Sequence, residues 1–291
     1  MSDTLPVSAE ALERSNRDAD RLRELISAPG ILIMPGAYDT VTAQLFEAMG
    51  FQAIQGTSGG IAGALGYQDG EVISREMMVE VYRRMVEAVQ VPVNADGEKG
   101  YGGPEDVAVT VERLVAVGAA GINLEDGDYR RGGGAARLIA LDLAKAKIEA
   151  FMAKRRSLGS KLFLNARVDA FLASDDHSSA LNEAIVRGNE YAALGADCIL
   201  FTRAGGTETI RILAREVKAP ISILAGPDSP PPAELEEIGL ARVSYGASFF
   251  NQALAGVKAL AEILLAEDDP REQLNQGFPS RGFQGLRTAL K

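Results

Sequence analysis

PVNADGEKGYG, residues 92–102, ends a short apolar run and opens into a turn that carries two carboxylates, Asp96 and Glu98. The glycines that follow allow the backbone to bend tightly, a pattern typical of a buried strand that opens into a site. Two acidic residues two positions apart can hold a hard divalent cation through oxygen while the ion keeps several waters. Taken alone, such a pair is more often an exposed acidic loop, because most charged side chains lie at the surface. The remainder of the chain decides between these interpretations.

Length and composition indicate a folded, soluble chain of one domain. The 291 residues fit a single α/β barrel with terminal extensions, and 46% hydrophobic with 24% charged residues is ordinary for a globular protein. A net charge of −10 argues against nucleic acid or an anionic membrane as a partner. Cys198 is the only cysteine, so no intramolecular disulfide can form, as expected in a reducing compartment. Without an apolar signal-peptide core or a membrane span, the chain is expected to be cytoplasmic.

Short apolar runs rich in β-branched residues alternate along the chain with longer segments whose apolar positions fall three and four apart. Eight such β-then-α units predict a closed parallel (β/α)8 TIM barrel, with one domain over 1–291. A leading helix within 1–28 precedes the barrel, and a polar tail, 267–291, follows it. We place the strands at 31–34, 53–55, 91–95, 121–125, 161–166, 198–202, 221–225 and 243–245. The helices are placed at 40–49, 75–89, 104–117, 140–157, 178–194, 207–217, 232–238 and 247–266.

Active sites of such barrels lie at the C-terminal ends of the strands, so the residues after each apolar run are the candidates for chemistry. Carboxylates at these positions can bind a divalent cation, directly or through water. The GTSGG segment, 56–60, offers backbone N–H groups to an anionic oxygen, and an arginine can bind a carboxylate through two hydrogen bonds. In chain order the candidates are Tyr38, Asp39, Thr57, Ser58, Gly59, Asp69, Asp96, Glu98, Glu125, Asp126, Arg167, Asp169 and Arg203.

Several of these residues have a purely structural alternative. A Gly/Ser/Thr segment is more often a simple turn than an anion site, because these residues are the ordinary turn formers. Arg167 can equally pair with Asp169 or Glu125 in a structural ion network. His177, the only histidine, lies in a polar stretch and is interpreted as a surface or helix-start residue rather than a base.

Taken together, these motifs resemble the isocitrate lyase and phosphoenolpyruvate mutase superfamily over about residues 20–265. The resemblance is carried by MPGAYD (34–39), GTSGG (56–60), LGYQD (65–69), DGEKGYG (96–102), LED (124–126) and NARVD (165–169). It implies an α/β barrel that binds Mg²⁺ or Mn²⁺ and a small substrate with an α-oxygenated carboxylate. It further implies that the metal is held, mostly through waters, by Asp96, Glu98, Glu125 and Asp69. Thr57 and Ser58 would hold substrate oxygens, Arg167 would orient the developing enolate, and the predicted substrate site is completed by Tyr38, Asp39, Gly59 and Arg203.

The segment after the fourth predicted strand departs from the best-known relatives. Isocitrate and methylisocitrate lyases carry a Lys-Lys/Arg-Cys-Gly-His segment whose cysteine acts as acid and base, whereas this chain has GDYRRGGG at 127–134. The longer asparagine-containing segment of the phosphonopyruvate-forming mutases is missing too, so neither those two lyase activities nor mutase activity is the first expectation. Tyr129 is the candidate to close over the substrate, with Arg130 and Arg131 as alternatives, because the three glycines let the segment move.

We therefore expect a Mg²⁺-dependent lyase that cleaves a C–C bond in a small 2-hydroxy or 2-oxo di- or tricarboxylate through an enolate or aci-carboxylate. A divalent cation and backbone donors stabilise the charge that such cleavage leaves on oxygen. The alternative within the family is phosphonopyruvate or oxaloacetate chemistry, by hydrolysis, decarboxylation or mutase-type transfer. Outside it, the alternatives are a non-catalytic binding protein and a lysine Schiff-base aldolase, although strands four to eight hold no lysine except Lys161.

The predicted helix 247–266 is more apolar than one barrel face requires. Relatives in the superfamily exchange their last helix between subunits and assemble as dimers of dimers, so the resemblance implies a homotetramer. The alternative is a helix that packs on its own barrel.

Overall fold

A computed structural model describes residues 6–128 and 137–277, in which nine parallel strands form a nearly closed barrel. The two ends of the sheet, β1 (Leu32–Met34) and β2 (Gly36–Ala37), are consecutive segments of the chain. β1 pairs with the last strand, β11 (Arg242–Ser244), whereas β2 pairs with β3 (Ile54–Gly56). The break between them falls at Pro35, which has no N–H to donate to a neighbouring strand. β1 lies within the first predicted strand, 31–34, whereas β2 follows it and was not predicted as a strand; the predicted TIM-barrel class is confirmed.

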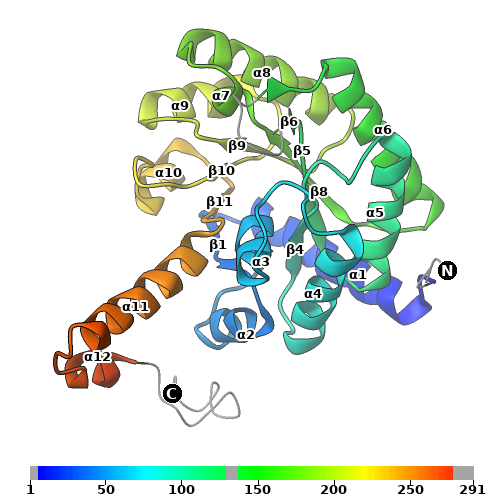
Figure 1. Ribbon diagram of the computed structural model, residues 1–291. Coiled ribbons are helices and arrows are strands. Elements are labelled where there is room, and N and C mark those ends of the chain that lie inside the picture. Colours follow the sequence, from blue (N-terminus) through cyan, green and yellow to red (C-terminus); the bar gives the residue numbers. More distant parts are fainter. Residues whose placement is uncertain (1–5, 129–136, 278–291) are drawn as a thin grey trace.

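The predicted alternation of strands and helices is confirmed, with boundaries that differ from the prediction by at most two residues. The remaining barrel strands are β4 (Val93–Asp96), β5 (Gly121–Glu125), β8 (Phe163–Val168), β9 (Cys198–Thr202) and β10 (Ile221–Leu224). The helices surround the sheet (Figure 1) and are α2 (Thr40–Ala48), α4 (Arg75–Ala88), α5 (Pro104–Ala116), α6 (Leu141–Ser157), α8 (His177–Ala193), α9 (Thr207–Glu216) and α10 (Pro232–Ile238). Short elements that the sequence did not predict are α3 (Ser58–Ala64), α7 (Ala170–Ala173), α12 (Arg271–Gln276) and the antiparallel pair β6 (Gly127–Asp128) and β7 (Arg137–Leu138).

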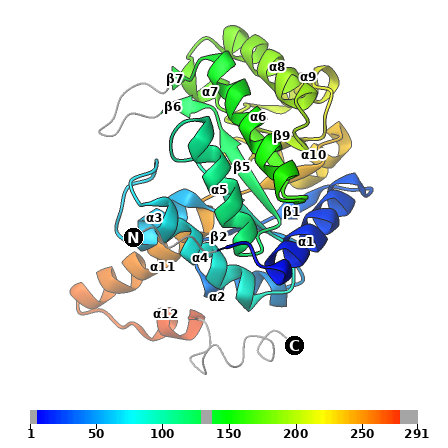
Figure 2. The same cartoon turned by 90° about the vertical axis from the view of Figure 1, so that its right-hand side faces the viewer.

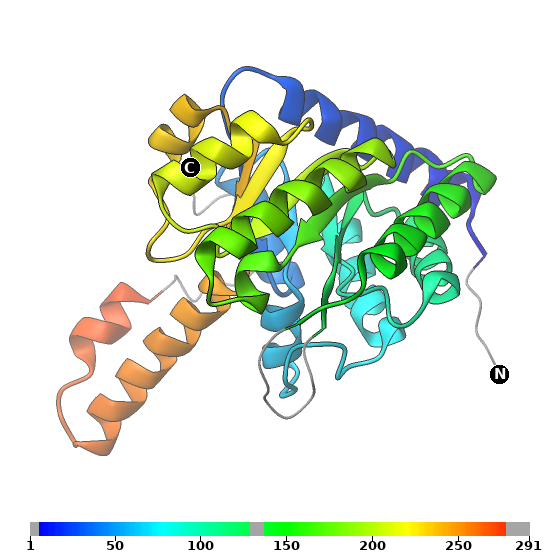
Figure 3. The same cartoon turned by 90° about the horizontal axis from the view of Figure 1, so that it is seen from above.

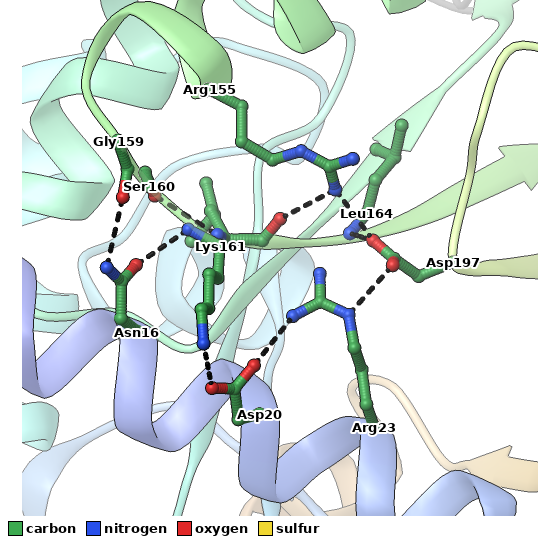
Figure 4. A network of polar contacts seen from close by, with 10 residues as sticks. Asn16, Asp20, Arg23, Arg155, Gly159, Ser160, Lys161, Leu164 and Asp197 are labelled. Atoms are coloured by element: carbon green, nitrogen blue, oxygen red, sulfur yellow. Dashed lines mark hydrogen bonds and ion pairs between the residues drawn. The ribbon is translucent and has the colours of Figure 1, made fainter.

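Helix α1 (Ala9–Ser27) is the leading helix predicted within 1–28, and it closes the N-terminal end of the barrel. Its apolar face packs against residues at or next to the starts of four strands: Leu22, Leu25 and Ile26 join one buried cluster with Leu32, Ala53, Phe163 and Cys198. A polar network reinforces this contact (Figure 4). The carboxylate of Asp197 accepts hydrogen bonds from Arg23 Nε (2.9 Å), Arg155 Nη1 (3.0 Å) and the Leu164 N–H (2.8 Å). One side chain thereby links α1, α6 and β8.

Replacing Asp197 with alanine is expected to destabilise the protein by about 2 kcal/mol, because two arginines and a buried N–H lose their common acceptor. The Asp197 side chain is only 16% exposed, so water replaces these bonds poorly. The matched control is Glu24→Ala on the same helix, which breaks the exposed pair with Arg21 and should cost less than about 0.5 kcal/mol. Urea unfolding of both variants measures the difference, and equal losses would remove Asp197 as the anchor of α1.

Helix α11 (Ser248–Leu265) projects away from the barrel (Figures 1, 2 and 3). Only its first turn contacts the barrel closely, where the Phe249 ring lies 4.7 Å from Phe46 and the Phe250 ring lies 5.3 Å from Tyr38. No residue of α11 is buried, and its exposed apolar side chains include Leu254, Val257, Leu264 and Leu265. The helix therefore does not pack along its own barrel, and its exchange between subunits stays a prediction. Across residues 6–128 and 137–277, no helix has both the length and the hydropathy to cross a membrane.

Candidate active site

The ends of β3, β4, β5 and β8 surround a cavity of about 200 Å³ at the C-terminal mouth of the barrel. Several predicted site residues line it together, namely Thr57, Ser58, Gly59, Asp69, Asp96 and Arg167. A second cavity of about 520 Å³ lies beside it, between the ends of β8, β9 and β10, and Arg203 lines this one. Arg167 and Leu224 line both cavities, so the two adjoin. The structure thus gathers residues from distant parts of the sequence around one mouth.

The GTSGG segment is not a turn, as its sequence suggested, but the start of α3. Thr57 is the N-cap, and its Oγ1 accepts a hydrogen bond from the Gly60 N–H (3.4 Å). The glycines allow close packing that larger residues would prevent: a Cβ on Gly60 would lie 2.9 Å from Tyr38, and one on Gly59 would lie 2.9 Å from Asp69 Oδ2. The segment therefore caps α3, and its glycines let Asp69 lie close to it at the edge of the cavity.

The carboxylates of the cluster are held by backbone and hydroxyl donors. Asp96 Oδ2 accepts from Ser58 Oγ (2.9 Å) and from the Ser58 N–H (3.4 Å), and Asp96 Oδ1 accepts from the Glu98 N–H (3.2 Å). Glu98 Oε2 accepts from the Glu71 N–H (2.9 Å), whereas Glu98 Oε1 is buried and has no hydrogen-bond partner among the described residues. Glu98 itself adopts φ +49°, a backbone conformation that is uncommon for a residue other than glycine. The acidic turn found in the sequence is therefore a buried, ordered structure.

Burial and mutual repulsion make it energetically unfavourable for the carboxylates of this cluster to be ionised together. Burial raises the pKa of Asp96, against the attraction of Arg167, and the charge of Asp69 adds to the rise. Burial raises the pKa of Glu98 to about 8, with further contributions from Asp96 and Asp69. Burial also raises the pKa of Glu125 well above its usual range, opposed by Arg167. A bound cation would remove this cost, because it would replace repulsion with attraction and favour the ionised carboxylates.

The donor set fits Mg²⁺ that keeps much of its water shell. No three of the acidic, histidine or cysteine side chains in the described ranges lie close enough to hold one ion directly. All side-chain atoms of the cluster that could bind a metal ion are oxygens, however. Glu98 Oε1, which is buried and has no hydrogen-bond partner among the described residues, is the kind of atom that an ion or its bound water satisfies. Mg²⁺ dehydrates reluctantly and usually binds through one or two carboxylates plus waters. Water-mediated binding by Asp69, Asp96, Glu98 and Glu125 is thus compatible with the structure.

Arg167 forms the ion pairs with Glu125 and Asp169 that its sequence context suggested, and it also lines both cavities. It is the register partner of Glu125 across β5 and β8, and Arg167 Nη1 lies 2.5 Å from Glu125 Oε2. On its other side, Arg167 Nε donates to Asp169 Oδ1 (2.8 Å). The Arg167 side chain is nonetheless 14% exposed and lines both cavities. The two carboxylates therefore fix a guanidinium that still faces the space available to a substrate.

Other predicted residues lie outside the smaller cavity. Asp39 is the N-cap of α2, where its Oδ1 accepts from the Thr42 N–H (2.8 Å), and neither Asp39 nor Tyr38 lines either cavity. Arg203 follows β9 with φ +49° and is exposed at the larger cavity. Tyr129, with Arg130 and Arg131, lies outside the described residues. His177 is an exposed residue at the start of α8, as predicted, and its Nε2 lies 2.8 Å from Thr209 Oγ1.

Three buried polar residues that line the smaller cavity were not predicted from the sequence. Gln55, Asn123 and Ser244 line this cavity from inside the barrel, and each precedes or lies near a strand end. The signal was present, because a buried amide within an apolar strand needs partners and rarely occurs without a reason. Asn123 Oδ1 accepts from Asn94 Nδ2 (2.9 Å) and Asn165 Nδ2 (2.8 Å), which ties β4, β5 and β8 together beneath the carboxylates.

The metal-free protein is expected to lose stability as pH rises from about 4.5 to about 8. The Glu98 pKa rises from 4.5 to about 8 on folding, so the folded state binds its proton more tightly than the unfolded chain. The stability gained from this proton is complete below pH 4.5 and is lost as pH rises through about 8. Mg²⁺ needs the ionised carboxylate, so its affinity should increase over the same range by up to about tenfold per pH unit.

Thermal unfolding in EDTA and calorimetric Mg²⁺ titrations between pH 5.5 and 9 measure both effects. In Glu98→Gln the amide stays neutral throughout, so the pH dependence in EDTA should shrink. An unchanged slope in this variant would show that another group is responsible.

Both the sequence and the fold of this chain are similar to those of known proteins. The family model described as phosphoenolpyruvate phosphomutase matches residues 22–265. An oxaloacetate decarboxylase of Bradyrhizobium sp. strain ORS 278 is 30% identical over 95% of this chain and 91% of its own length. A 2-methylisocitrate lyase of Aeropyrum pernix is 33% identical over 69% of this chain and 63% of its own length. Among solved structures, oxaloacetate acetylhydrolase in complex with the product oxalate has a TM-score of 0.78 and 26% identity, covering 94% of this chain and 93% of that one.

Proposed function

Because this chain belongs to the isocitrate lyase/PEP mutase superfamily, we propose that it is a Mg²⁺-dependent lyase that cleaves a C–C bond in a small 2-hydroxy or 2-oxo di- or tricarboxylate. The observation that carries the proposal is the convergence of Asp69, Asp96, Ser58 and Arg167 on one cavity at the barrel mouth. Cleavage beside a carbonyl leaves an electron pair on carbon that is stored as an enolate or aci-carboxylate. Buried donors and a cation at this mouth are suited to hold such a charge.

Each residue has a distinct role in this proposal. Asp96, Glu98, Glu125 and Asp69 hold Mg²⁺, mostly through waters, and the ion supplies a Lewis acid for the oxygen on which negative charge develops. Arg167, whose guanidinium lines the cavity, binds a substrate carboxylate or enolate oxygen. Ser58 lies at the same edge of the cavity, where its hydroxyl and its N–H donate hydrogen bonds to Asp96. Thr57 supports this edge as the cap of α3.

The larger cavity is proposed to take the part of the substrate beyond the scissile bond. Its lining combines apolar side chains, Leu172, Ile223 and Leu224, with the guanidinium of Arg203. No ion pair or hydrogen bond of the Arg203 side chain occurs within residues 6–128 and 137–277. A second carboxylate on the substrate would supply one, which supports a di- or tricarboxylate over a simple 2-oxo monocarboxylate.

Replacing Arg203 with glutamine is expected to lower kcat/KM at least about tenfold for acids with a distal carboxylate, through a higher KM, because one charge-assisted bond is lost. Oxalate has no distal carboxylate to contact Arg203, so its affinity should stay within about twofold. Arg211→Gln on α9 is the matched control, since the Arg211 side chain is 56% exposed and lines neither cavity. Equal losses for oxalate and for the longer acids would contradict this role of Arg203.

Oxaloacetate chemistry is the second candidate, and two observations favour it. A relative that covers 95% of this chain is named oxaloacetate decarboxylase, and an oxaloacetate acetylhydrolase shares the fold. Loss of CO₂ from a 3-carboxy-2-oxo acid breaks the C–C bond without prior removal of a proton from a hydroxyl. The enolate that remains takes up a proton at carbon from water to give the 2-oxo acid, so this reaction does not require the cysteine of the true lyases.

The test is to incubate the purified protein and Mg²⁺ with a panel of such acids and to follow pyruvate, glyoxylate, oxalate and CO₂. Glyoxylate or pyruvate together with a second carboxylic acid identifies lyase activity, CO₂ with pyruvate identifies decarboxylation, and oxalate with acetate identifies hydrolysis. Phosphate from phosphonopyruvate identifies C–P hydrolysis. A Schiff-base aldolase is less well supported, because no lysine of the described ranges lines either cavity; borohydride trapping with substrate tests it.

We also propose a homotetramer in which α11 is exchanged between subunits, in a cytoplasmic enzyme without nucleic-acid or membrane partners. The exposed apolar side chains of α11 support a second copy of the chain as its cover. Light scattering coupled to gel filtration measures the assembly. The double substitution Leu254→Glu and Val257→Glu should lower the mass if the proposal holds.

A further inference from the structure

Glu125 and Asp126 are consecutive residues, but their side chains face different layers of the fold. Glu125 faces the barrel, where it pairs with Arg167. Asp126 faces α8, where Tyr191 Oη donates to Asp126 Oδ2 (2.6 Å) and Arg187 Nη1 donates to the same oxygen (3.2 Å). Asp126 is 2% exposed and Arg187 is 4% exposed. A buried ion pair thus lies directly behind the site, and the proposed chemistry does not use it.

Arg187 and Asp126 together hold the point at which the chain returns from the loop after β5. Ile139 follows β7, and its carbonyl accepts from Arg187 Nη2 (3.0 Å). The Ile139 N–H donates to the Asp126 carbonyl (3.0 Å). Both backbone groups of one residue are therefore bonded to this pair. β6 and β7, which lie on either side of the loop after β5, pair with each other and form the base of this loop.

Asp126 also reaches Arg167 through one intermediate. Asp126 Oδ1 accepts from the Asp169 N–H (2.9 Å), and Asp169 Oδ1 in turn accepts from Arg167 Nε (2.8 Å) and from Thr202 Oγ1 (2.5 Å). Asp169 is fully buried. The orientation of the Arg167 guanidinium therefore depends on a carboxylate whose backbone is fixed by Asp126.

We propose that Arg187 is a positioning residue that, through Asp126 and Asp169, fixes Arg167 and couples it to the base of the loop after β5. The proposal rests on the proposed function in one respect, the role of Arg167 in substrate binding. An arginine suits this position because its planar fork bonds Asp126 and the Ile139 carbonyl at the same time, whereas a lysine is a single point charge. Because Arg187, Asp126 and Asp169 are buried, solvent replaces a lost bond poorly, and a change at Arg187 is passed on to its partners.

The experiment compares Arg187→Lys with Glu183→Gln. The control removes only the outer contact, in which Arg187 Nε donates to Glu183 Oε1 (2.7 Å), and the Glu183 side chain is 42% exposed. Hydrogen–deuterium exchange reads out the Asp169 and Ile139 amides, and calorimetry reads out oxalate and Mg²⁺ affinity. In Arg187→Lys both amides should exchange faster and oxalate affinity should fall about tenfold, as for other supporting residues, while Mg²⁺ affinity stays within about twofold. Glu183→Gln should resemble the wild type.

A folded Arg187→Lys protein with unchanged Asp169 exchange and unchanged oxalate affinity would overturn the proposal. Equal effects from Glu183→Gln, or parallel losses of Mg²⁺ and oxalate affinity, would do so as well, because they indicate general destabilisation. If Arg187→Lys does not fold, Tyr191→Phe, which deletes one hydroxyl, should give a smaller change in the same direction. If the exchange and affinity shifts occur but the wild type cleaves no acid, the positioning role stands and the proposed activity fails.

Discussion

Replacing Asp96 with asparagine is expected to lower kcat/KM about a thousandfold and to abolish stabilisation of the protein by Mg²⁺. Asp96 lies at the centre of the site, where its carboxylate receives the Ser58 hydroxyl and the Glu98 N–H and lines the smaller cavity. An asparagine keeps the shape but removes the charge that attracts the metal, and its amide cannot accept every bond that the carboxylate accepts. Steady-state kinetics at saturating Mg²⁺ and thermal unfolding with and without the ion measure these effects.

The same substitution should leave the metal-free protein as stable as the wild type, or slightly more stable. Burial raises the pKa of Asp96, so an ionised carboxylate is unfavourable there without a cation. Asp106→Asn is the control, because Asp106 caps α5 and lines neither cavity. Activity within tenfold of the wild type for Asp96→Asn, or retained stabilisation by Mg²⁺, would contradict the role of Asp96 in metal binding.

Replacing Arg167 with methionine is expected to reduce activity by about two to three orders of magnitude and stability by about 3 kcal/mol. The arginine pairs with Glu125 and Asp169, so its loss leaves two buried carboxylates without their cation. It also removes the only arginine that lines the smaller cavity within the described ranges. Kinetics and urea unfolding of the same preparation separate the two effects.

Arg167→Lys distinguishes charge from geometry at this position. A lysine can satisfy one of the two carboxylates but not both, so stability should recover in part while oxalate affinity stays low. If lysine restores both properties, Arg167 acts as a simple counter-charge and does not bind substrate through its fork. If methionine affects stability alone, Arg167 is purely structural, the alternative that its neighbours Glu125 and Asp169 already suggested.

The barrel could be predicted because its strands and helices differ in local pattern. β5 (GINLE) and β9 (CILFT) each follow a glycine that ends the preceding helix, Gly118 and Gly195, and both strands are found with the predicted boundaries. Short elements could not be predicted in the same way. α3 contains three glycines in seven residues, a composition with poor helix propensity, and it forms because Thr57 caps it and Phe250 packs against Gly63. Tertiary contacts of this kind leave no periodic signal in the sequence.

The site could be predicted for residues at the ends of the barrel strands, but not for residues whose position depends on tertiary packing or on helix capping. Asp96, Glu125 and Arg167 meet because parallel strands end at one edge, which the order of the sequence already implies. Asp39 also follows a strand, yet it caps α2, because its spacing to Thr42 completes a capping box. The contact between Arg187 and Asp126 joins a helix to a strand end far away in the sequence, and only the fold reveals it.

The most direct test of a Mg²⁺-dependent enolate site is the binding of oxalate, a planar dianion that resembles the enolate of a 2-oxo acid, measured by calorimetry in Mg²⁺ and in EDTA. The account predicts that oxalate binds and raises the melting temperature only when Mg²⁺ is present, since a ligand selective for the folded state stabilises it. It also predicts that Asp96→Asn loses this binding. Equal oxalate affinity in Mg²⁺ and EDTA, or unchanged affinity in Asp96→Asn, would contradict it.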